Sequence, residues 1–132
     1  MKTKTIQQTL TLYASPHEVY EMLMDEKKHA QFTGSTAQIS RKVGGTFVTN
    51  NGYSNGINKE LVKDTKIVQT WRASDWPDEH YSTLTITLSF VESKTKLSFV
   101  QTGVPEDQYE AISKGWYDYY WNPLKKALEK ST

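Results

Sequence analysis

Cysteine is absent from the 132 residues, which excludes disulfides and thiolate metal sites. Histidine is scarce as well: the chain has His17, His29 and His80, and no two of them have the spacing of a ligand pair. We therefore expect no metal and no cofactor. His17 lies at a predicted helix start and His29 in a lysine-flanked segment, so we interpret both as solvated.

The chain also lacks an excess of charge of one sign. Its 16 basic and 15 acidic residues give a net charge of +1, and only Arg41 and Arg72 are arginines. A nucleic-acid partner normally requires a clear basic excess, so we expect none. No apolar run approaches the ~20 residues of a membrane span, and the first residues do not form a signal peptide. A cytoplasmic protein is the expectation.

Residues that initiate catalysis are missing too. There is no Gly-x-Ser-x-Gly nucleophile motif, and Gly44-Gly45 precedes a predicted strand, not the helix that a phosphate-binding loop needs. The carboxylate pairs at 25–26, 78–79 and 106–107 are sequence neighbours that we interpret as solvated charge. We therefore expect a protein that is not an enzyme.

What is present is a regular pattern of strands. Residues 6–13 alternate, and the even positions from Leu84 to Phe90 are apolar while the odd ones are Thr or Ser; Leu97 and Phe99 repeat the alternation. Ser15-Pro16 with Glu18 predicts a capped helix ending near Lys27. A second short helical piece follows over residues 28–32, and then a run of about six strands.

The C-terminal part carries an apolar helical stripe. After Pro105, apolar residues recur at every fourth position: Ile112, Trp116, Tyr120, Leu124 and Leu128. Pro123 lies inside this stripe and predicts a kink. The order of elements predicts an α+β protein in which a curved antiparallel sheet is covered by this long helix.

Several polar residues fall at positions that the alternation directs inward. Gln101 continues the phase of Leu97 and Phe99, and Gln69 shares a face with Trp71. Gly56 predicts a bulge, and we expect Asn58, Glu60 and Val62 to share its face. Such polar groups either hydrogen-bond within the core or orient a ligand in an apolar cavity. The candidate ligand-binding residues are Gln69, Trp71, Phe99, Gln101, Trp116 and Tyr120.

The motifs also occur in a specific order: Ser15-Pro16, residues 43–47, residues 67–72, Trp76-Pro77, residues 101–105 and Gly115-Trp116. In this order the chain resembles the C-terminal domain of the activator of 90 kDa heat shock protein ATPase homologue family, within the START-like helix-grip superfamily. The resemblance covers residues 5–129. It implies one START-like domain over residues 1–132, with a six- to seven-stranded curved sheet, two short helices after the first strand and a long C-terminal helix.

Three functions remain open. The first is binding of a small apolar ligand in a cavity between the sheet and the C-terminal helix. The second is a protein-interaction module that regulates a chaperone ATPase, with the positive charges at 27–28 and 41–42 facing an acidic partner. The chain has no room for the N-terminal domain of the eukaryotic family members, which argues against full co-chaperone activity. The third is a cyclase- or hydrolase-type enzyme, which would need a carboxylate beside His80 in a cavity.

Overall fold

The first strand and the two helices after it form where the sequence predicts them. The computed structural model describes residues 1–129; residues 130–132, which the predicted domain includes, lie outside the described residues. Strand β1 (Thr3–Leu12) leads into α1 (Pro16–Met24), whose capping box joins Ser15 and Glu18. Helix α2 (Glu26–Thr33) begins earlier than predicted, because Asp25 caps it by accepting from two backbone N–H groups.

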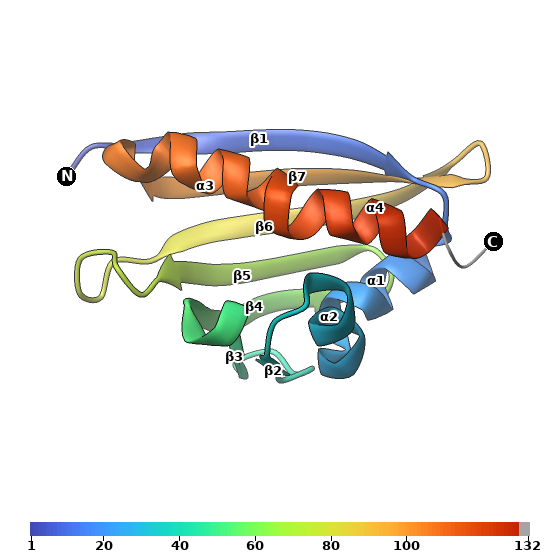
Figure 1. Cartoon of the computed structure of the whole chain (residues 1–132), viewed down its shortest axis with the longest axis horizontal. Coiled ribbons are helices and arrows are strands. Elements are labelled where there is room, and N and C mark those ends of the chain that lie inside the picture. Colours follow the sequence, from blue (N-terminus) through green and yellow to red (C-terminus); the bar gives the residue numbers. More distant parts are fainter. Residues whose placement is uncertain (130–132) are drawn as a thin grey trace.

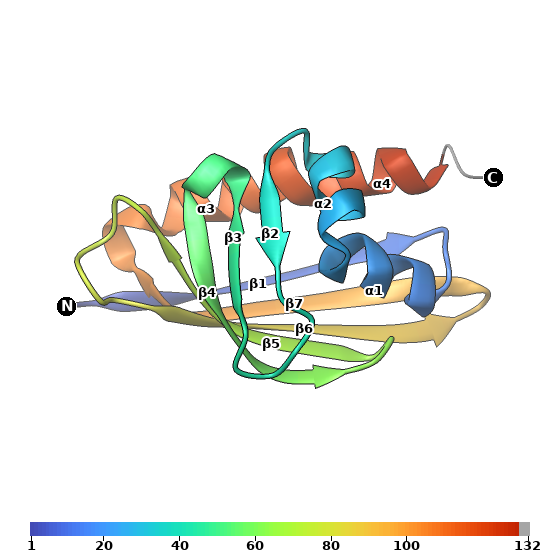
Figure 2. The same cartoon turned by 90° about the horizontal axis from the view of Figure 1, so that it is seen from below.

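The seven strands form one antiparallel sheet in the order β1-β7-β6-β5-β4-β3-β2. Besides β1, its strands are β2 (Ala37–Ile39), β3 (Thr46–Thr49), β4 (Ser54–Val62), β5 (Lys66–Ala73), β6 (Ser82–Val91) and β7 (Lys94–Pro105). Figure 1 shows the C-terminal helical segment lying along β1 and β7. Figure 2 shows β4, β3 and β2 turning up from the rest of the sheet beside this segment. The predicted helix-grip fold is therefore confirmed.

The bulge in β4 does not lie at the predicted position. The register shifts between Asn58 and Glu60, two residues beyond Gly56. Because the extra residue reverses the alternation, Glu60 and Val62 are exposed and Leu61 packs against the core. The prediction that Glu60 and Val62 face inward was wrong. Gly56 serves a different purpose, because a Cβ there would lie 1.8 Å from the Thr70 carbonyl oxygen.

The C-terminal helical segment is irregular just before Pro123. A short 3₁₀ turn (Glu106–Gln108) leads into α3 (Tyr109–Trp116), and a π-helical turn (Tyr117–Trp121) connects α3 to α4 (Asn122–Glu129). In this turn Asn122 N–H donates to the Tyr117 carbonyl, five residues earlier. The predicted distortion therefore takes the form of a π turn, a feature often found at functional sites.

Candidate functional site

Aromatic rings fill the space between the sheet and the C-terminal helical segment. Trp116 is at the centre, with ring centroids 4.6 Å from Phe99, 4.8 Å from Tyr120, 5.4 Å from Trp121 and 5.7 Å from Trp71. All five side chains are buried. Four of the six predicted ligand-binding residues, Trp71, Phe99, Trp116 and Tyr120, thus lie together in the core.

Both polar atoms of the buried Gln101 amide bond to protein groups. Its Oε1 accepts from Trp116 Nε1 at 2.8 Å, and its Nε2 donates to Ser82 Oγ at 2.9 Å. Ser82 Oγ in turn donates to the Trp71 carbonyl at 2.7 Å. This chain of bonds ties the helix to β7, β6 and β5. It gives both polar atoms of the buried Gln101 amide a protein partner, so this side chain does not need a ligand to be hydrogen-bonded.

Gln69 lies away from this network and supports a loop. Its Nε2 donates to Asn58 Oδ1 at 2.9 Å. Asn58 Nδ2 donates to the carbonyls of Ser40 and Lys42, at 2.7 and 3.0 Å. Gln69 thus positions the amide that holds the β2–β3 connection against the sheet.

His29 is buried, and the prediction that it is solvated was wrong. Its Nδ1 lies 3.0 Å from the Leu23 carbonyl and its Nε2 3.0 Å from the Tyr120 hydroxyl. Because a carbonyl only accepts, the proton is on Nδ1, and Nε2 accepts from Tyr120. The flanking lysines suggested an exposed segment, but α2 directs only Lys27 and Lys28 to solvent and turns His29 to the core. Burial also raises the pKa of Tyr120 to about 12.

This buried imidazole makes stability depend on pH. Burial lowers the pKa of His29, although its bond to the Leu23 carbonyl opposes the shift. The unfolded chain therefore binds this proton at a higher pH than the folded chain does. As a result, the free energy of unfolding falls as the pH decreases below about 6.5. One proton gives a slope of at most ~1.4 kcal/mol per pH unit. Urea denaturation between pH 7.5 and 5.5 measures the slope. His29→Gln should flatten it more than the exposed control His17→Gln; equal slopes in both variants would contradict the assignment.

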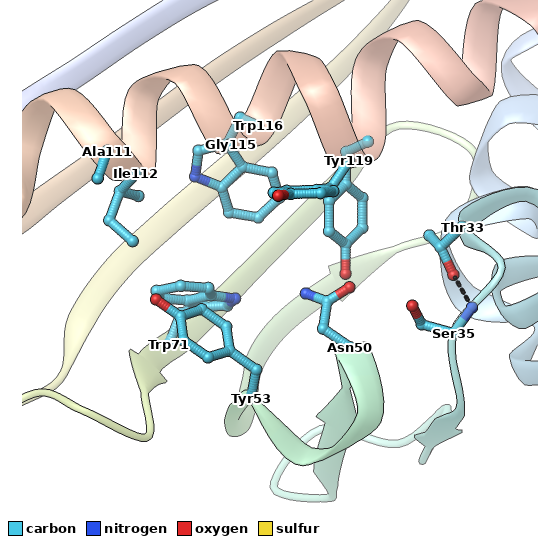
Figure 3. Close-up of a pocket in the computed structure, with 11 residues that line it drawn as sticks. Thr33, Ser35, Asn50, Tyr53, Trp71, Ala111, Ile112, Gly115, Trp116 and Tyr119 are labelled. Atoms are coloured by element: carbon cyan, nitrogen blue, oxygen red, sulfur yellow. Dashed lines mark hydrogen bonds between the residues drawn. The ribbon is translucent and has the colours of Figure 1, made fainter.

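An open cleft of about 490 Å³ lies beside the aromatic core, between α3, the π turn and the β3–β4 connection. Figure 3 shows Trp116 and Tyr119 on one side and Trp71 and Tyr53 on the other. Its remaining lining residues are Thr33, Ser35, Asn50, Ala111, Ile112, Gly115 and Tyr120. Of the predicted site residues it brings Trp71, Trp116 and Tyr120 together. Phe99, Gln101 and Gln69 do not line it.

Sequence reasoning missed the outer wall of this cleft. Tyr53 and Asn50 lie at the turn between β3 and β4, where Asn51-Gly52 indicated only a hairpin. The π turn sends Tyr119 outward, 67% exposed, while Tyr120 points into the core. A regular helix pattern carries no signal for that turn, and only Pro123 marked the region as irregular.

Within the described residues, the titratable groups that line the cleft are the tyrosine hydroxyls of Tyr53, Tyr119 and Tyr120. Among residues 1–129, no carboxylate or histidine lines it, and no three His, Asp or Glu side chains gather where they would hold a metal ion. His80 lies outside the cleft, and its Nε2 donates to the Gly103 carbonyl at 2.8 Å. No helix in the described residues is long and apolar enough to cross a membrane.

Comparisons with known proteins identify relatives over the whole domain. A family model described as Activator of Hsp90 ATPase homolog 1-like protein matches residues 13–129. An activator of 90 kDa heat shock protein ATPase homolog from Dictyostelium discoideum is 37% identical over 132 residues, which is 98% of this chain and 34% of that protein. Homolog 1 from Homo sapiens is 30% identical, over 89% of this chain and 35% of the relative. The chain spans about a third of the length of these relatives.

Solved structures agree with this result. An HSP90 activator from Plasmodium falciparum superposes with a TM-score of 0.87 and 28% identity, over 95% of this chain and 96% of that one. The Aha1 dimer from Colwellia psychrerythraea has a TM-score of 0.82 and 21% identity, over 96% of each chain. At that identity it supports the fold alone.

Proposed function

This chain belongs to the family of Activator of Hsp90 ATPase homolog 1-like proteins, and from this premise we propose that it is a non-catalytic domain that binds and regulates an Hsp90-type ATPase. The observation that carries the proposal is the 37% identity over 98% of the chain to a protein named as an activator of that ATPase. The absence of carboxylates and histidines from the cleft lining, within residues 1–129, is compatible with a regulatory role.

Exposed lysines of α2 and of the β2–β3 connection are the part of this protein that we assign to the contact. Lys27, Lys28 and Lys42 are exposed, and within the described residues none of them forms an ion pair; Arg41 nearby is bonded to Glu21. Free lysines attract an acidic surface and accelerate encounter with it. We therefore assign these three lysines to the contact with an acidic face of the chaperone.

The ATPase rate of an Hsp90-type chaperone, measured with increasing amounts of this chain, tests the proposal. We expect a saturable increase of several-fold. A triple charge reversal of Lys27, Lys28 and Lys42 to Glu should weaken the activation at least tenfold in half-saturating concentration. The matched control reverses Lys59, Lys63 and Lys96, three exposed lysines elsewhere, with the same change in net charge.

The outcomes separate the function from the patch. An unchanged ATPase rate together with no detectable binding would refute the regulatory function. Equal weakening by both triple variants would show that overall charge, not the α2 surface, controls the interaction.

The cleft supports a second candidate function, binding of a small and mostly apolar ligand. Its volume of about 490 Å³ lies within the ~300–1,000 Å³ of ligand pockets, which are lined mainly by aromatic and apolar groups. A ligand at a hundredfold excess over its dissociation constant stabilises the fold by about 2.7 kcal/mol. Thermal-shift screening with fatty acids, sterols and aromatic polyketides tests this function, and a screen without a stabiliser would count against it.

A further inference from the structure

The interior between sheet and helix has no room for a long ligand. Trp71, Trp116 and Tyr120 close the floor of the cleft. Behind them the remaining void measures about 40 Å³, roughly the volume that one water occupies in the liquid. An extended acyl chain would have to displace this aromatic core. Between the sheet and the C-terminal helical segment, a ligand therefore has space only in the open cleft, which suits a compact molecule.

The walls of the cleft select against charge. None of its eleven lining residues is charged, although charged residues make up 23% of the chain. An anion placed there would lose hydration without gaining a positive partner, which is costly, and a cation would find no lining carboxylate and only ring faces to replace its hydration. The flat faces of tyrosine and tryptophan instead favour contact with another ring.

The two ends of the cleft differ in polarity. Figure 3 shows Ala111 and Ile112 at one end, and Thr33, Ser35 and Asn50 at the other. The Thr33 hydroxyl donates to the His29 carbonyl, and the Asn50 amide donates to Ser54 Oγ. The Ser35 hydroxyl forms no hydrogen bond within the described part of the chain. This hydroxyl is available for a polar group at one end of a ligand.

We propose that the cleft binds a compact, uncharged ring compound with a hydrogen-bonding group at one end, oriented toward Ser35, and that it excludes long-chain lipids. The inference rests on the ligand-binding function proposed above and specifies its chemistry. Tyr53 and Tyr119, 39% and 67% exposed, form the two sides of the entrance. The ring lies between them and the core tryptophans, with its apolar end toward Ile112.

A matched series of naphthalene derivatives provides the test: 2-naphthol, naphthalene, 2-naphthoate, 2-naphthylmethylammonium and, as the acyl chain, decanoate. Titrations followed by amide and indole NH shifts give both affinity and position. We expect 2-naphthol to bind most tightly and to shift the Gly115 amide and the Trp116 indole, while the Trp121 indole, outside the cleft, shifts little. Both charged derivatives and decanoate should bind at least ten times more weakly.

Variants test the orientation. Ser35→Ala should weaken 2-naphthol about two- to tenfold, the net effect of one hydrogen bond, and leave naphthalene unchanged. Tyr119→Ala should weaken both ligands, whereas Tyr117→Ala, an exposed tyrosine of the same turn outside the cleft, should weaken neither.

Each contrary result has a distinct meaning. Equal or tighter binding of the anion, the cation or decanoate would overturn the inference, as would shifts that map outside the cleft or no binding by any ring compound. Stabilisation by a sterol or fatty acid in the screen above would still leave the broader ligand-binding function standing, and the ATPase assay would remain unaffected by either result.

Discussion

Trp116→Ala will lower the free energy of unfolding by about 3–5 kcal/mol, the usual range for deleting a large buried aromatic. The indole contacts Phe99, Tyr120 and Trp121 at once. Its loss also leaves Gln101 Oε1 buried without its donor, which adds a desolvation penalty. The change removes a large part of a total stability of ~5–15 kcal/mol.

Urea denaturation measures this loss. Should Trp116→Ala fail to fold, Trp116→Phe keeps one ring in the core, removes the indole N–H and part of the ring contacts, and should cost about 1–3 kcal/mol. Tyr119→Ala, three residues along the same helical segment but exposed, is the control and should change stability by less than ~0.5 kcal/mol. A midpoint for the Trp116 variants equal to that of the control would contradict the anchoring role.

Gly56→Ala will be similarly severe although it adds a single methyl group. The new Cβ would lie 1.8 Å from the Thr70 carbonyl oxygen and 2.8 Å from Phe47 Cε2. The first obstacle is backbone of the paired strand, so β4 and β5 must separate to accommodate it. Overpacking of this kind costs about 1–3 kcal/mol or more, and we expect the upper end.

Gly115→Ala is the matched control, because the same methyl group there would meet only the Tyr119 ring at 3.6 Å. A helical alanine is favoured over glycine by up to ~1 kcal/mol, so this variant should be neutral or more stable. Thermal denaturation of both variants measures whether Gly56→Ala alone lowers the melting temperature. A melting temperature for Gly56→Ala within a degree of the parent would show that the two strands can part at little cost.

Local patterns predicted the elements because burial here follows simple periodicity. Leu84, Ile86 and Leu88 are buried while Thr83, Thr87 and Ser89 are exposed, as a sheet with one covered face requires. The stripe from Ile112 to Leu128 is buried along its length for the same reason. The capping box at Ser15 is equally local and is confirmed.

The parts that sequence could not predict depend on contacts between distant segments. The bulge follows Asn58, whose side chain bonds to the β2–β3 connection. The residues next to Asn58 carry no signal for a contact with a segment so far away in the sequence. The polar candidates Gln101 and Gln69 turned out to bind other protein groups, which periodicity cannot distinguish from a ligand. The cleft brings Tyr53 and Tyr119 together from segments 66 positions apart (119 − 53).

Strand β1 has a consequence for how the chain is made. Gln8 lies opposite Phe99 in β7 and accepts from Trp121 Nε1, 113 positions later. A ribosome therefore releases β1 long before either partner exists, and the nascent strand stays unpaired until β7 has been made. Unpaired strands tend to associate with other chains. The outward positions of β1 hold threonines, a lysine and a glutamine. One face of the unpaired strand is therefore hydrophilic until β7 and the C-terminal helical segment pack against it.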